Sequence, residues 1–303
     1  MKPLFQHTLT NSFTLWFDHF LLKKGEAYRN LPTVDAMPLT YVADGQLDPD
    51  YIAYTSPYKQ WVFDSDISGA DIVSEVVTGA ETWDRGTTND GSGVDPKMSV
   101  DYLNGRVIFN KNVTSALTVS VASVAVKDFN IYATDESEES LVVEDKYDTN
   151  SRFFEVVTPI DPYKQVVPAI FIANQGSRND PVALGGLDNT ITEFRCVVFA
   201  ENLYQLDGAL SVFNDSKNEI FYQVNYDDHP IDEFGDIKSS IGGSATNNIY
   251  KYSELPFEEV ASPYTVSNVV VSKLSDKVNT KISPGLFIGF IDIEVSKFRY
   301  PRE

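Results

Sequence analysis

The stretch Ser99-Val-Asp-Tyr-Leu-Asn-Gly-Arg-Val-Ile-Phe109 decides the fold class, because it carries the strongest structural signal in the chain. Two runs of β-prone residues flank Asn104-Gly105. This dipeptide favours the positive backbone φ angles that both central residues of a type I′ turn adopt. The stretch therefore predicts a β-hairpin with a two-residue turn.

The β pattern continues on both sides of this hairpin. Apolar residues alternate at Val119 and Val121 and then resume in the opposite phase at Val124 and Val126, which indicates a bend or bulge between them. Further strands are predicted at 60–63, 72–77, 129–131, 141–143, 169–173, 192–200, 266–271 and 286–295, with a loop at 175–189. The expected fold is mainly β with few helices (β or α+β), built as antiparallel β-sandwich or barrel-like domains.

Two segments show helical spacing instead. One covers 202–213. The other is an N-terminal amphipathic helix, which Asn11 or Ser12 can cap and Gly25 can end. Its apolar stripe is unusually aromatic and consists of Phe13, Trp16, Phe17, Phe20 and Leu21. Such a stripe packs on the chain's own core or docks on another subunit, and we expect these five residues to dock on a partner.

The domain organisation follows from where the strand signals begin. Residues 31–58 are rich in proline and tyrosine and are predicted to form an extended connector. Pro159, Pro162 and Pro168 mark a second boundary. The expected units are an N-terminal helix with a docking arm (1–58), a first β domain (59–158) and a second β-rich domain with one helix (159–303).

Composition excludes several classes of protein. The 24 basic residues against 44 acidic ones give a net charge of −20, whereas binding to phosphates or to an anionic membrane requires clustered Lys and Arg. We therefore expect no sequence-specific nucleic-acid contact and no membrane partner. The single cysteine, Cys196, lies in an apolar run and is expected to be a buried small hydrophobe. The N-terminus does not have the pattern of a signal peptide, so the protein is expected to stay where it is made.

One stretch could bind a metal. Asp64, Asp66, Ser68, Gly69 and Glu75 match positions 1, 3, 5, 6 and 12 of the EF-hand calcium loop. The motif needs flanking helices, however, and here the flanks are predicted strands. An acidic β-turn explains the same residues. We therefore expect no cofactor, with Ca²⁺ at Asp64, Asp66, Ser68 and Glu75 as the alternative.

No catalytic residue is assigned from the sequence. The three histidines, at positions 7, 19 and 229, are not spaced as metal ligands. Paired carboxylates of a glycosidase would be hidden among so many acidic residues, and the sequence locates no such pair. The chain is expected not to be an enzyme.

Three stretches carry a resemblance: Val100-Asp-Tyr-Leu-Asn-Gly-Arg-Val-Ile-Phe109, Phe129-Asn-Ile-Tyr132 and Phe194–Phe213. Together they resemble virion structural proteins of tailed bacteriophages, and the aromatic helix with its connector resembles the opening segment of neck or tail-completion proteins. The resemblance implies a protein of the head–tail connector or tail that is made in the host cytoplasm and located in the virion. It also implies a ring-forming homo-oligomer that contacts other virion proteins.

A second class of function is compatible with the same composition. Abundant tyrosine and tryptophan also suit a receptor- or carbohydrate-binding module of a tail fibre or surface layer, because these side chains stack on sugars and partners. A connector protein should form closed rings, whereas such a module should bind cells or glycans as an isolated protein.

Overall fold

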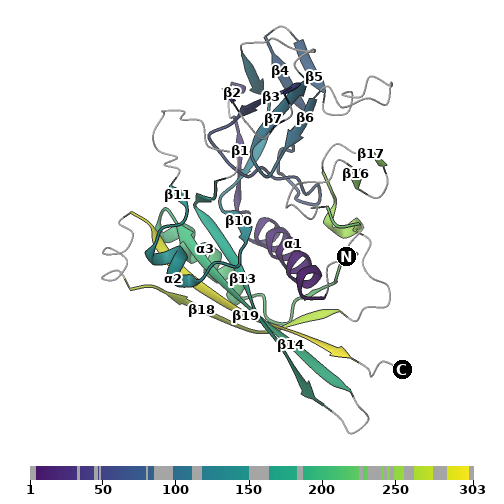
Figure 1. Cartoon of the computed structure of the whole chain (residues 1–303), viewed down its shortest axis with the longest axis vertical. Helices are drawn as coiled ribbons and strands as arrows, with labels where there is room; N and C mark the ends of the chain where they lie inside the picture. Colours follow the sequence, from purple (N-terminus) through teal and green to yellow (C-terminus); the bar gives the residue numbers. More distant parts are fainter. Residues whose placement is uncertain are drawn as a thin grey trace.

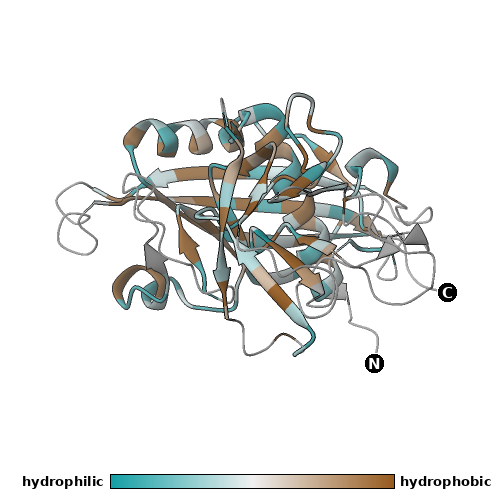
Figure 2. Ribbon diagram, turned by 90° about the horizontal axis from the view of Figure 1, so that it is seen from above, coloured by the Kyte–Doolittle hydropathy of each residue, from teal (hydrophilic) through white to brown (hydrophobic). Residues whose placement is uncertain are grey.

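The computed structural model describes residues 5–32, 35–43, 47, 49–79, 81–84, 98–110, 118–149, 164–182, 187–224, 228–230, 240–241, 244–245, 249–255, 263–275 and 285–299. The fold is mainly β with few helices, as predicted, and the strand pairs are almost all antiparallel. Two large curled sheets occupy opposite ends of the molecule (Figure 1). Hydrophobic and hydrophilic residues alternate along the strands and helices (Figure 2).

The first large sheet has seven strands, in the order β5 (Glu81–Asp84), β4 (Glu75–Thr78), β8 (Val119–Val121), β2 (Met37–Val42), β3 (Tyr51–Thr55), β7 (Arg106–Asn110) and β6 (Met98–Asp101). Strands β2 and β3 lie in its middle, so the prediction of an extended connector at 31–58 is wrong. The prediction was wrong because it took the prolines of this segment as evidence against strands. At Pro38 only β8 is paired with the strand, so the missing N–H donor of this proline is not needed by a second neighbour.

The second large sheet has six strands, in the order β10 (Asn130–Ala133), β13 (Ala169–Pro181), β14 (Asp188–Ala200), β19 (Phe287–Arg299), β18 (Tyr264–Lys273) and β15 (Ile220–Phe221). Only β10 and β13 are parallel within it. Strand β13 runs past a bulge at Asn174–Gly176 to Pro181. The predicted loop at 175–189 is therefore wrong, because cross-strand pairing extends this polar strand end without any apolar alternation.

The predicted boundaries do not coincide with the sheets. The boundary at residue 58 follows directly after two strands of the seven-stranded sheet, and β10, which was assigned to the first β domain, pairs in the six-stranded sheet. Short pairs complete the structure: β1 (Tyr28–Leu31) with β9 (Val124–Lys127), β11 (Asp148–Thr149) with β12 (Val166–Val167), and β16 (Ser240–Ile241) with β17 (Ser244–Ala245). The phase change at residues 122–123 separates β8 from β9, which belong to different sheets.

The hairpin predicted at 99–109 is present, but its turn differs. Asp101 pairs with Arg106, so four residues form the loop instead of two. Gly105 has a φ of 59°, and Asn104 is not among the described residues with positive φ. Asp101 determines this geometry, because its carboxylate accepts hydrogen bonds from the backbone N–H of Asn104 (3.1 Å) and from Arg106 Nε (2.7 Å).

In the described ranges, three α-helices flank the six-stranded sheet. Helices α1 (Phe5–Gly25) and α3 (Leu203–Asn214) share a hydrophobic core with one face, and α2 (Glu138–Val143) packs on the other. Helix α3 is where it was predicted, and Asn202 caps it by accepting from Gln205 N. Helix α2 replaces a predicted strand. Helix α1 begins before the predicted caps, since Ser12 lies inside it and its hydroxyl donates to Thr8 O.

The five residues predicted to dock on a partner lie in the core of their own chain. Phe13, Trp16, Phe17, Phe20 and Leu21 are between 0% and 7% exposed. The ring of Phe13 stacks on Phe194 and that of Phe17 on Phe213, both with centroids 3.8 Å apart. The docking prediction is therefore contradicted, and the alternative interpretation, packing on the chain's own core, describes the structure. Leu15, on another side of α1, joins the core of the seven-stranded sheet.

Candidate functional site

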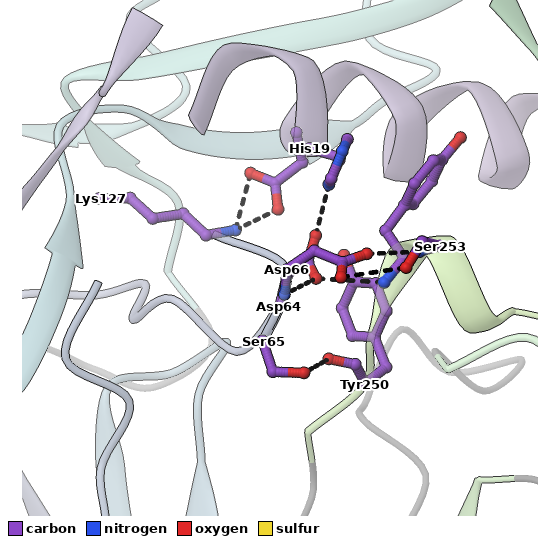
Figure 3. A network of polar contacts seen from close by, with 9 residues as sticks. His19, Asp64, Ser65, Asp66, Lys127, Tyr250 and Ser253 are labelled. Carbon is purple, nitrogen blue, oxygen red and sulfur yellow. Dashed lines mark hydrogen bonds and ion pairs between the residues drawn. The ribbon is translucent and has the colours of Figure 1, made fainter. Parts of the chain in front are cut away.

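A group of polar side chains with a buried centre lies where α1 meets the loop that follows Phe63 and the short 3₁₀ helix η1 (Tyr252–Glu254) (Figure 3). The group comes from four separate segments of the chain. We call it the buried polar network, and it consists of Asp18, His19, Asp64, Asp66, Lys127, Tyr250, Tyr252 and Ser253.

Asp64 is the centre of this network and is only 1% exposed. One carboxylate oxygen lies 2.6 Å from His19 Nδ1. The other accepts hydrogen bonds from the backbone N–H of Asp66 (3.0 Å) and of Tyr252 (3.1 Å). The imidazole of His19 also stacks on the ring of Tyr252, with centroids 4.3 Å apart. A single carboxylate thus joins α1, the 64–66 loop and η1.

An ion pair lies beside Asp64 (Figure 3). Lys127 Nζ donates to both oxygens of Asp18, at 2.9 and 2.8 Å, and both side chains are buried. The ammonium also lies 5.3 Å from the centroid of the Phe63 ring. Burial of two charges is costly, and two direct hydrogen bonds with an aromatic contact offset that cost. The pair connects α1 to the end of β9.

Asp66 and Ser65 attach the same loop to the segment at 250–253. The carboxylate of Asp66 accepts from the backbone N–H and the hydroxyl of Ser253. Ser65 donates its backbone N–H (2.8 Å) and its hydroxyl (3.0 Å) to Tyr250 O. These bonds link residues more than 180 positions apart in the chain, so the network closes a long-range contact.

The hydroxyl of Tyr250 differs from its neighbours, since it is buried and has no hydrogen-bond partner in the described part of the chain. Burial raises the pKa of the Tyr250 phenol well above its ordinary value, and the negative charge of Asp64 raises it further. The pKa of Tyr252 is raised by the same two causes in the same order. Both phenols are therefore neutral at physiological pH.

The chemical capability of the network follows from this geometry. An imidazole oriented by a carboxylate is the arrangement that enzymes use for a general base. Here the Asp64 carboxylate also binds two backbone N–H groups, and the phenol of Tyr252 covers the His19 ring. These additional contacts fix the positions of three backbone segments, so the effect that the geometry supports best is structural.

The calcium candidates are distributed over different surroundings. Asp64 and Asp66 hydrogen-bond to protein donors within the network. Ser68 and Glu75 are exposed, and Glu75 begins β4 opposite Asp84. In the ranges that the structure describes, no group of three or more His, Cys, Asp or Glu residues is placed to hold a metal ion. The segment from Asp64 forms a turn, in which Ile67 N donates to Asp64 O.

Sequence reasoning missed most of the network. Asp64 and Asp66 were selected for a different reason, and Lys127 and Tyr250 were not selected at all. One available signal was the presence of Asp18 and His19 inside the aromatic stripe of α1, because a charged residue amid buried positions usually has a buried partner. Cys196 is buried, as predicted, and burial raises the pKa of its thiol.

No protein-family model matches the chain, and no curated protein matches it either. Among the described residues, no helix combines the length and the apolar character needed to cross a membrane.

The network yields a prediction about stability. Asp64→Ala should lower the free energy of unfolding by about 2–4 kcal/mol, because it leaves two partly buried N–H donors and the His19 imidazole without their acceptor. Tyr250→Phe should change it by less than about 1 kcal/mol, since it removes a hydroxyl that has no partner. Urea unfolding of both variants would measure the difference. Equal losses would contradict the assignment of Asp64 as the centre, and a large loss in Tyr250→Phe would indicate an unseen partner of its hydroxyl.

Proposed function

We propose that this chain is a non-enzymatic structural protein of a tailed-phage particle, which assembles through protein–protein contacts as a ring in the head–tail connector, neck or tail. The observation that carries the proposal is an exposed region of the six-stranded sheet. The partners in this assembly are further copies of the chain and other virion proteins. The position in the virion rests on the resemblance described above, and the assembly itself rests on the surface described next.

Helix α2 covers only part of the outer face of the six-stranded sheet. Leu141 and Val142 pack there against a cluster that includes Val197 and Phe290. Beyond this cluster, no helix that the structure describes lies above the strands, and β13, β14 and β19 extend away from the body (Figure 1). We call this region the open sheet face. Its side chains include Arg178, Glu193, Arg195, Val270, Asp292, Glu294 and Phe298.

Ion pairs that link three strands fix the side chains of the open sheet face. Arg178 forms an ion pair with Glu193, and its Nη2 atom lies 3.7 Å from Glu294 Oε1. Arg195 binds Asp292 at 2.5 Å, and its guanidinium lies 4.5 Å from the Phe290 ring. Exposed pairs of this kind stabilise the fold weakly, because solvent screens them. They nevertheless hold the arginines in fixed orientations, which lowers the entropy lost on binding a partner.

Apolar side chains lie at two margins of the open sheet face. Phe298 is 53% exposed near the end of β19, and Val270 is 51% exposed on β18. Arginine and aromatic residues are enriched in protein–protein interfaces, and they often supply most of the binding energy. The combination supports a contact with another protein subunit. The net charge of −20 supports a particle surface that does not bind DNA.

Assembly provides the test. Light scattering after size exclusion, together with negative-stain microscopy, should show closed rings of the purified protein at micromolar concentration. Phe298→Glu should shift the distribution to monomers without a change in melting temperature, because this side chain is already exposed. Tyr41→Glu is the matched control, since Tyr41 is equally exposed on the other sheet. A monomer at all concentrations that binds glycans or host cells would favour the receptor-binding alternative.

A further inference from the structure

Strand β18 forms an exposed edge of the six-stranded sheet. In the described part of the chain, its outer side is bonded at one end, where β15 pairs with Tyr264 and Thr265 and the preceding residues Asn218 and Glu219 bond to Val266. Leu274 donates its N–H to Ile288 O on β19. Backbone groups alternate in direction along a strand, so Val269 and Val271 turn their N–H and C=O groups away from β19. Within the described residues, no hydrogen bond satisfies these outward groups.

The opposite edge of the sheet is protected, and β18 is not. Past its pairing with β10, strand β13 carries a bulge at Asn174–Gly176, the charged residues Arg178 and Asp180, and Pro181 at its end. Each of these features discourages another strand from pairing. By contrast, β18 presents Asn268-Val-Val-Val-Ser272, which has high β propensity and no charge or proline and follows the bulge between Val266 and Asn268. The edge is therefore suited to accept a strand.

A groove beside this edge indicates which side chains a strand added to β18 would contact. Its volume is about 650 Å³, and it is lined by Asp207, Leu210, Ser211, Asn214, Asp215, Val271, Ser272 and Lys273. Asp207 forms an ion pair with Lys273, whereas Asp215 is exposed at the end of α3. The chain as a whole carries a charge of −20. A strand added here therefore meets the exposed carboxylate of Asp215, which is not among the groups paired with Lys273.

We propose that the free edge of β18 binds an extended, lysine- or arginine-rich segment of a partner protein by strand addition. Backbone hydrogen bonds to Val269 and Val271 would supply the affinity, and basic side chains facing Asp215 and the strongly acidic chain would supply the selectivity. This inference refines the proposed function by naming the chemistry of one partner, and it requires only that the chain assembles with another protein.

A second copy of the chain fits this edge less well. Two β18 strands paired about a two-fold axis would place both α3 helices on the same face of a continuous sheet. The exposed carboxylates of Asp215 from both copies would then lie on that shared face. Like charges close together oppose association, and the net charge of each copy adds to the repulsion. The charge distribution thus favours a basic partner.

The test uses the full-length, ¹⁵N-labelled protein and the peptide acetyl-Lys-Thr-Lys-Val-Lys-Thr-Lys-amide. The amide resonances of Val269, Val271 and their neighbours should shift in a saturable manner. The same sequence with glutamate in place of lysine should bind at least tenfold more weakly, and so should a form N-methylated at alternate residues. The N-methylated peptide keeps the charge but loses the hydrogen-bond donors. It therefore separates strand addition from attraction between charges.

A variant of the protein tests the same proposal independently of changes in the peptide. Val271→Pro removes one outward N–H that has no partner among the residues that the structure describes, and proline is tolerated at such edge positions. It should weaken binding at least tenfold, whereas Val271→Thr, which retains the N–H, should not. Equal binding of the lysine and N-methylated peptides would overturn the proposal, and so would self-association that Val271→Pro abolishes. If the rings described above form but no peptide binds, this inference fails and the proposed function stands.

Discussion

Gly105→Val is expected to lower the free energy of unfolding by about 4 kcal/mol or more, through backbone strain and steric overlap together. Gly105 has a φ of 59°, a conformation that β-branched residues rarely adopt. A Cβ atom at this position would lie 2.0 Å from Tyr58 O and 2.5 Å from Lys59 O. Both obstacles are backbone atoms, so no side-chain rotation can relieve the overlap. Urea unfolding monitored by circular dichroism would measure the loss.

Gly79→Val separates the contribution of backbone strain from that of steric overlap. Gly79 has nearly the same φ, 61°, but a Cβ there would have no heavy atom within 4 Å. This control should cost only the backbone strain, about 1–3 kcal/mol. Losses of the same size at both positions would show that the chain at Tyr58 and Lys59 moves away from residue 105. The tight packing of the hairpin loop against this segment would then have to be abandoned.

The same loop shows what the sequence could predict and what it could not. Local patterns located the hairpin, because Asn104-Gly105 between β-prone runs is a short-range signal. They did not determine the turn type, since the carboxylate of Asp101 and the approach of residues 58–59 select a four-residue loop. Likewise, the strand predicted at 286–295 is present as β19, in which Ile291, Ile293 and Val295 are buried.

Long-range contacts were the main source of error. The aromatic stripe of α1 was recognised, but the surface that covers it comes from residues between 129 and 295, which the sequence does not show to be adjacent. The prolines of the 31–58 segment suggested a connector, although pairing with β7 and β8 makes it the centre of a sheet. The buried polar network was not predictable either, because its hydrogen bonds join positions such as 64 and 252. Each of these errors concerns contacts between residues that are far apart in the sequence.

Breaking the Asp18–Lys127 ion pair of the buried polar network should have the second large effect on the free energy of unfolding. Lys127→Met is expected to lower the free energy of unfolding by about 3–5 kcal/mol, because it leaves the Asp18 carboxylate buried without its cation. Both partners are almost inaccessible to water, with side-chain exposures of 3% for Lys127 and 8% for Asp18. Methionine has a similar length and can keep the contact with the Phe63 ring, so little of the loss would come from packing.

A double-mutant cycle isolates this electrostatic contribution. Asp18→Leu alone should also be costly, since it leaves a buried ammonium. The double variant Asp18→Leu/Lys127→Met should lie within about 2 kcal/mol of the wild-type protein, because apolar residues of similar volume can replace a buried ion pair. Additive losses in the double variant would mean that the two charges do not depend on each other. If both single variants lost less than about 1 kcal/mol, water would have to reach the pair. Recovery in the double variant would show that the contact between α1 and β9 tolerates an apolar pair and that the cost of each single change is an uncompensated charge.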